Sequence, residues 1–158
     1  MTEQPDGYQP WSQYGIPQQV YFTHSPPGAT QTWLCEGEWD AIMLGWAVRH
    51  SALRNDIQVC CFTYGAGNVP PDAEIARIST GVVVFYDLDE AGRKGEAKVA
   101  ERLGDRAKVA KVPSPTDPKP GWDVSDALNF GFALEDFSKA AQQARSIQRQ
   151  LDPPRPSE

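Results

Sequence analysis

Two aspartates separated by one residue follow an apolar run in the stretch VVVFYDLDEAGRKG, residues 82–95. Side chains alternate along an extended strand, so Asp87 and Asp89 are expected to point the same way. Two carboxylates held close together repel each other unless a positive charge lies between them. We expect a divalent metal ion there, because hard cations such as Mg²⁺ and Mn²⁺ prefer oxygen ligands. A metal ion so placed usually acts on phosphate, so the stretch indicates phosphate chemistry.

Further acids follow other apolar runs. Glu36 comes directly after TWLC, residues 32–35, and Asp123 and Asp126 lie in WDVSDAL, residues 122–128. In an open parallel sheet, ligands bind beyond the carboxyl ends of the strands, so these side chains are expected to share one site with the aspartate pair. Gly37 and Gly92 stand beside the acids and leave room for a ligand or metal to approach the backbone.

The strands and helices of the chain must position these acidic side chains. Apolar runs at 32–35, 57–65, 81–87 and 107–113 predict four strands, and helical patterns predict helices at 39–50, 72–78, 90–103 and 134–150. Strands that alternate with helices indicate parallel pairing, and continuous apolar runs indicate a sheet covered on both faces. The predicted fold is therefore α/β, a three-layer α/β/α sandwich with a central parallel sheet of four strands. Counting only these strands along the chain, we expect the order 2-1-3-4.

Composition limits the classes of function. The 158 residues carry a net charge of -6, which argues against a surface that holds nucleic acid by bulk electrostatics. Cys35, Cys60 and Cys61 fit no zinc-site spacing and are predicted to be buried thiols in a reducing compartment. The polar N-terminus and the absence of a long apolar run predict a cytoplasmic protein without a membrane contact. We expect an N-terminal extension at 1–30, partly ordered, the main domain at 31–130, a C-terminal helix at 131–150 and a disordered tail at 151–158.

Three of these stretches resemble the motifs of the Toprim domain, which topoisomerases and primases share. CEGEWDAIML resembles its Glu-Gly-x-x-Asp-Ala motif, and YDLDEAGRKGEAKVAERL resembles its Asp-x-Asp-x-x-Gly motif. WDVSDAL resembles the third acidic element of primases and primase-helicases. The resemblance covers about residues 32–130 and is closer to the primase branch than to topoisomerases.

The resemblance implies a Rossmann-like catalytic module of a DNA primase or primase-helicase, encoded by a phage, plasmid or mobile element. Its implied substrates are a single-stranded DNA template and nucleoside triphosphates, and its implied partner is a replicative helicase or another replication protein. In the implied site, Glu36 is the general acid or base. The implied Mg²⁺ ligands are Asp87, Asp89, Asp123 and Asp126, and Arg93 and Lys94 are implied to contact phosphates. No zinc-binding segment or phosphate loop of a helicase motor is recognisable, so the chain is expected to act with partners or as part of a larger assembly.

Other interpretations remain open. The same acids suit a Toprim nuclease, and a non-catalytic, metal-dependent module that binds nucleic acid or a partner is a further alternative. A phosphatase of the haloacid-dehalogenase type is disfavoured, because Ala91 stands where that chemistry usually has Thr or Val.

Plainer roles are also available for single residues. Asp89 suits a helix N-cap, and Glu38 and Asp40 suit the first turn of a helix. Trp33, Trp39, Trp46 and Trp122 are predicted to pack in the core or at its edge. Arg145 and Arg149 are predicted to lie on a solvated helix face, with a nucleic-acid or partner surface as the alternative.

Overall fold

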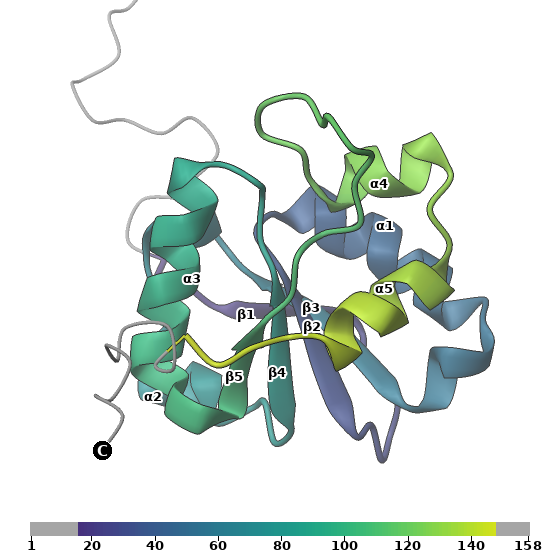
Figure 1. Ribbon diagram of the computed structural model, residues 1–158. Coiled ribbons are helices and arrows are strands. Elements are labelled where there is room, and N and C mark those ends of the chain that lie inside the picture. The colour runs from purple at the N-terminus through teal and green to yellow at the C-terminus, as the bar shows by residue number, and fades with distance from the viewer. Residues whose placement is uncertain (1–15, 148–158) are drawn as a thin grey trace, which may run out of the picture.

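A five-stranded sheet with helices on both faces forms the protein in a computed structural model that describes residues 16–147 (Figure 1). The strands are β1 (Val20–His24), β2 (Gln31–Cys35), β3 (Ile57–Phe62), β4 (Gly81–Phe85) and β5 (Ala107–Val109). Their order across the sheet is β1-β3-β2-β4-β5. In the centre β2 and β4 run parallel, with Cys35 opposite Phe85. The segments that begin at residues 36 and 86 therefore leave the sheet at the same edge.

The predicted order and parallel pairing of four strands are confirmed, because β3, β2, β4 and β5 are neighbours in that order and all parallel. The prediction of a purely parallel, four-stranded sheet is wrong. A fifth strand, β1, pairs antiparallel with β3, with Val20 opposite Phe62. Val20, Tyr21 and Phe22 form only a short apolar run, and of β1 only Val20 is buried, so the signal of this edge strand in the sequence is weak.

The helices are α1 (Glu38–Arg49), α2 (Asp72–Ile75), α3 (Glu90–Leu103), α4 (Val124–Phe130) and α5 (Leu134–Gln142). Short 3-10 turns occur at Ala52–Asn55 (η1), Gly65–Gly67 (η2) and Gly104–Arg106 (η3). The last helix is shorter than predicted, because α5 ends at Gln142 and the chain then returns to the sheet edge. There Arg145 and Val109 exchange two backbone hydrogen bonds, of 2.9 and 3.0 Å. Arg149 and the predicted tail lie outside the described residues.

Two apolar layers explain why the inner strands read as continuous apolar runs. Figure 1 shows α2 and α3 on one face of the sheet and α1, α4 and α5 on the other. Alternate residues of the strands belong to the two layers, so that Cys35 and Cys61 lie in one and Cys60 in the other. All three thiols are buried, as predicted, and burial raises the pKa of Cys61 to about 12.

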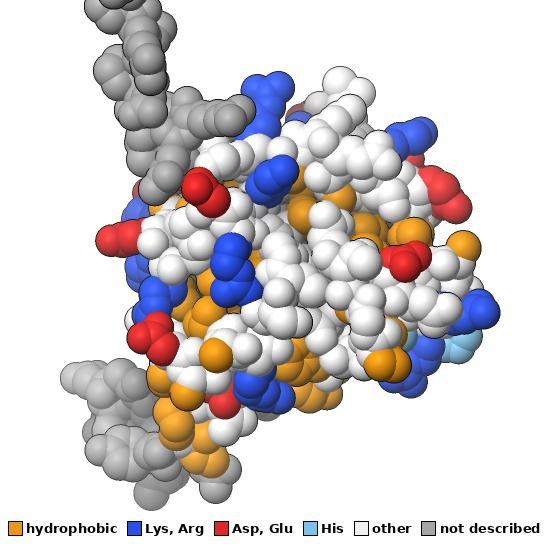
Figure 2. Space-filling view, turned by 90° about the horizontal axis from the view of Figure 1, so that it is seen from below, with side chains coloured by type: hydrophobic (Ala, Val, Ile, Leu, Met, Phe, Trp, Pro, Cys, Tyr) orange, Lys and Arg blue, Asp and Glu red, His pale blue; other side chains and the backbone are white. Residues whose placement is uncertain are grey.

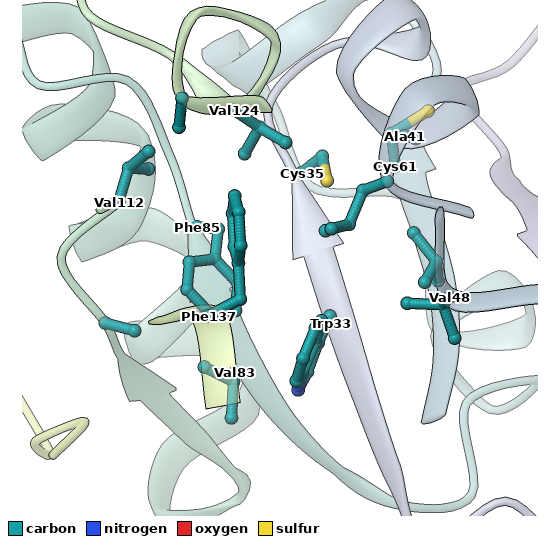
Figure 3. Close-up of a cluster of buried hydrophobic side chains, with 14 of the residues drawn as sticks. Trp33, Cys35, Ala41, Val48, Cys61, Val83, Phe85, Val112, Val124 and Phe137 are labelled. Carbon is teal, nitrogen blue, oxygen red and sulfur yellow. The ribbon is translucent and has the colours of Figure 1, made fainter. Parts of the chain in front are cut away.

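An aromatic cluster fastens α5 to the sheet (Figure 3). Phe137 of α5 is fully buried, and its ring centroid lies 5.6 Å from that of Phe85 and 6.4 Å from that of Trp33. Trp33 and Phe85 themselves meet edge to face at 5.5 Å. Because such pairs contribute about 0.5–1.5 kcal/mol beyond burial, this cluster holds the C-terminal helix against β2 and β4.

The outer surface differs from the prediction at two tryptophans. Trp33 and Trp122 are buried as predicted, but Trp39 and Trp46 are 68% and 65% exposed. They lie on the face of α1 opposite Ala41, Leu44 and Val48, which already fill the contact with the sheet.

On the face that Figure 2 shows, basic and acidic side chains are interspersed rather than separated into regions of one sign. Among the described residues, the helices are all too short or too polar to cross a bilayer.

Candidate metal centre

Three aspartates meet beyond the carboxyl ends of β2 and β4. Asp40, Asp87 and Asp123 each offer a carboxylate oxygen, and these oxygens all lie within 4.8 Å of one another. Asp40 is in the first turn of α1, Asp87 follows β4, and Asp123 is the N-cap of α4. Three segments far apart in the sequence therefore supply one group of oxygen ligands.

Asp87 is the most perturbed of the three carboxyls. Its pKa is raised to about 8, first by burial and then by the negative charges of Glu36, Asp40 and Asp123. Its Oδ1 atom is buried and has no hydrogen-bond partner among the described residues. A buried carboxylate oxygen without a partner is costly, and a cation removes that cost.

Glu36 lies beside this group and is tied to Asp87. Its Oε2 accepts a hydrogen bond from the backbone N–H of Asp87 over 2.9 Å. The pKa of Glu36 is raised, mainly by burial and also by the charges of Asp89 and Asp123, while the Asp87 N–H lowers it. A glutamate with a raised pKa exchanges protons closer to neutral pH than an exposed one does.

Asp40 is the residue whose role the sequence did not reveal. It was predicted only to decorate the first turn of α1, yet it is just 7% exposed and accepts hydrogen bonds from the backbone N–H and the hydroxyl of Ser125. Burial and the charge of Glu36 raise its pKa, although the Ser125 hydrogen bonds lower it. A signal was present, because Asp40 is the aspartate of the Glu-Gly-x-x-Asp-Ala motif that CEGEWDAIML resembles.

Asp89 and Asp126 both act as capping residues. Asp89 is the N-cap of α3, and its Oδ1 accepts from the backbone N–H of Gly92 over 2.7 Å. Asp126 forms a capping box with Asp123 at the start of α4, and its Oδ1 also pairs with Lys119 at 2.8 Å. The structure therefore brings Asp87 and Asp123 together with Asp40 and places the other two predicted ligands at helix starts around them.

The predicted phosphate contacts differ in their surroundings. Gly92 is required for space, because a Cβ atom there would lie 2.1 Å from the carbonyl oxygen of Asp87, whereas a Cβ at Gly37 would meet nothing within 4 Å. Lys94 is exposed and pairs with Glu90 at 3.1 Å. Arg93 is exposed as well and lines a groove beside Asp87.

The residues present fit a hard divalent cation. The donor set consists of carboxylate oxygens alone, and one of them, Asp87 Oδ1, lies buried and unpartnered among the described residues. Mg²⁺ is usually held by one or two carboxylates, with water and substrate phosphates completing its shell. The group thus has the composition of a metal centre that leaves positions for a phosphate ligand.

Comparison with solved structures shows the same fold in primases. The structure is similar to the Aquifex aeolicus primase (zinc-binding and RNA polymerase domains), with 22% identity, a TM-score of 0.52, and coverage of 77% of this chain and 27% of that one. It is also similar to a chain from bacteriophage T7 lagging-strand DNA polymerase interacting with primase domains of two gp4 subunits, bound to an RNA/DNA hybrid and dTTP. There the identity is 20%, the TM-score 0.52, and the coverage 75% of this chain and 57% of that one.

The described chain therefore has structural similarity to the Toprim, or RNA polymerase, domains of primases. At these identities the similarity shows the fold alone. No protein-family model and no curated protein matches the chain. The chain spans 27% and 57% of the lengths of the two chains it resembles.

Proposed function

We propose that this chain is the Toprim catalytic module of a primase-type nucleotidyltransferase, which joins nucleotides on a single-stranded DNA template within a larger assembly. The observation that carries the proposal is the group of Asp40, Asp87 and Asp123, whose oxygens lie within 4.8 Å of one another. The group lies beyond the carboxyl ends of the parallel strands β2 and β4, where ligands of open α/β sheets bind. The fold similarity to primases supports the reaction class.

Each residue has a proposed role. Asp87 and Asp123, with Asp40, would hold Mg²⁺ or Mn²⁺, and a bound ion supplies Lewis-acid stabilisation of the charge on phosphate. Glu36 would accept the proton of the 3′-hydroxyl of one nucleotide. The hydroxyl oxygen then bonds to the α-phosphorus of the next nucleoside triphosphate as the bond from that phosphorus to pyrophosphate breaks. Asp89 and Asp126 would support a second ion while they cap α3 and α4. Arg93 and Lys94, with Gly37 and Gly92 at the backbone, would contact phosphates.

The larger assembly is part of the proposal. Both solved chains are longer than this one, and the net charge of -6 disfavours tight independent binding of DNA. We propose a replicative helicase or another replication protein as the partner that presents the template.

The test is primer synthesis on a single-stranded template with nucleoside triphosphates and Mg²⁺, with and without an added replicative helicase. We expect synthesis that EDTA abolishes and that Asp87→Asn reduces to background. Asp105→Asn is the matched control, because this exposed aspartate lies in η3, just before β5 at the opposite edge of the sheet. Calorimetric titration should show Mg²⁺ binding to the wild type and the control, and much weaker binding to Asp87→Asn.

Two results would replace the proposal. Metal-dependent cleavage of labelled nucleic acid without nucleoside triphosphates, and no synthesis with them, would make the protein a nuclease. Metal binding without any turnover, even with helicase and template, would make it a binding module.

A further inference from the structure

A groove of about 1030 Å³ follows the β5 edge of the sheet. Its floor includes residues 109–114, which continue from β5, and its two sides come from α3 and α5 with the segment after α5. Figure 1 shows these two helices on either side of β5. Asp87 lines the groove as well, so the groove opens onto the candidate metal centre.

Four cations from separate parts of the chain line this groove: Arg93, Lys111, Lys139 and Arg145. All four are exposed, and none of them forms an ion pair with another described residue. Elsewhere the basic residues Lys94, Arg102 and Lys119 are each paired with a carboxylate. Of the nine described Lys and Arg side chains that form no ion pair, four line this one groove, and the other five, Arg49, Arg54, Lys98, Arg106 and Lys108, lie outside it.

The acids of the groove offset this charge only in part. Asp136 is occupied at the start of α5, where its Oδ2 accepts from the backbone N–H of Ala133 over 2.9 Å. The pKa of Glu96 is raised to about 7 by burial, even though Arg93 lowers it. Away from the metal centre, the positive charges outnumber the negative ones.

We propose that this groove binds the sugar–phosphate backbone of a single-stranded nucleic acid and leads the strand to Asp87. Charge complementarity carries the choice of ligand, because a row of unpaired cations along an open groove matches the repeating charge of a strand. The groove also presents partly exposed apolar side chains, Phe132 and Ile147, beside the cations, where sugars and bases would lie. The direction towards Asp87 depends on the proposed function, whereas the binding itself requires no metal ion.

The test measures binding of a fluorescent oligo-dT by anisotropy in EDTA at several salt concentrations. In the variant Lys111→Gln/Lys139→Gln, which alters the floor and one side of the groove, we expect affinity at low salt to fall about tenfold. The slope of log K against log salt should fall by about 1.4, because each phosphate contact with a single strand contributes about 0.7. Arg49→Gln/Arg54→Gln is the control, since both exposed arginines lie outside the groove at α1 and η1 and the charge change is the same. Equal affinities and equal slopes for the two variants would overturn the proposal.

The experiment also separates this proposal from the proposed function. Asp87→Asn should bind the oligonucleotide at least as well as the wild type in EDTA, because it removes a negative charge beside the groove. If the wild type binds the oligonucleotide through the groove but makes no primer, the groove proposal stands and the primase proposal fails. If primer synthesis occurs but the groove variant binds and synthesises like the control, the groove proposal alone fails.

Discussion

Asp40 and Ser125 are 85 residues apart in the sequence and are joined by two hydrogen bonds. The backbone N–H of Ser125 donates to Asp40 Oδ1 over 2.9 Å, and the Ser125 hydroxyl donates to the same oxygen. Asp40 lies in the first turn of α1 and Ser125 in the first turn of α4. The pair therefore ties the first acidic motif to the third, and so holds Asp123 beside Asp87.

Ser125→Ala removes the hydroxyl donor from a buried carboxylate. We expect the free energy of unfolding to fall by about 1.5–3 kcal/mol in urea denaturation, because a hydrogen bond to a charged group contributes that much. Affinity for Mg²⁺ should fall roughly tenfold, since residues that orient metal ligands have effects of that size. Ser79→Ala, at an exposed serine, should change neither quantity measurably. Equal results for the two variants would show that the Asp40–Ser125 pair does not position the site.

The stability of the metal-free protein should decrease as pH rises. The pKa of Asp87 is about 8 in the folded protein against an ordinary value of 3.8, so the folded state binds more protons than the unfolded state between these values. The free energy of unfolding therefore falls as pH rises through this window. Because Asp87 is partly exposed, we expect its contribution to be on the order of 1 kcal/mol. Thermal unfolding in EDTA from about pH 5 to about pH 8 measures it.

Asp87→Asn is the comparison for this pH dependence, because the amide does not ionise. Its stability should fall less steeply with pH than that of the wild type, although Glu36, Asp40 and Asp123 still have raised pKa values. Excess Mg²⁺ should restore the stability of the wild type near pH 8 and leave Asp87→Asn almost unchanged. A steeper slope in the variant than in the wild type would contradict the assignment of the pKa to Asp87.

The sequence predicted the inner sheet correctly because the physics there is local. The runs ending at Cys35 and Phe85 are buried at every position after the first, and helices cover both faces, so composition and the alternation of elements predict parallel strands. The order of the strands was the one that the resemblance to the Toprim domain implies. β1 was missed because it lies at an edge and buries only Val20 fully. Its pairing depends on contacts such as Val20 with Phe62, which no local pattern reports.

The grouping of the acidic side chains was predicted in part, again because some of the signal is local. Asp87 and Asp123 were found because each lies where an apolar run or a loop ends, and a local motif marks such positions. Asp40 was missed because an acid in the first turn of a helix usually interacts with the helix dipole, and its burial depends on α4 packing over α1. That packing is a tertiary contact between distant segments.

Gly92→Ala should distort the site from the backbone side. The new Cβ would lie 2.1 Å from the carbonyl oxygen of Asp87 and 3.0 Å from its carbonyl carbon. Backbone atoms cannot move aside cheaply, so we expect a loss of about 1–3 kcal/mol in urea denaturation, despite the better helix propensity of alanine. Gly67→Ala is the control, because a Cβ there meets nothing within 4 Å. If Gly92→Ala has the same stability and the same Mg²⁺ affinity as the wild type, the backbone at Asp87 tolerates the displacement and the prediction is contradicted.

Two substitutions of Asp89 separate its cap from its predicted role as a metal ligand. Asp89 Oδ1 accepts from Gly92 N–H over 2.7 Å at the start of α3. Asparagine caps helices about as well as aspartate, so Asp89→Asn should keep wild-type stability, whereas Asp89→Ala should lose about 1 kcal/mol. If Asp89 also contributes to metal binding, both variants should bind Mg²⁺ more weakly than the wild type in calorimetric titration, because both remove the negative charge. Wild-type Mg²⁺ affinity in Asp89→Asn would assign this aspartate to the helix cap alone and leave the metal to Asp40, Asp87 and Asp123.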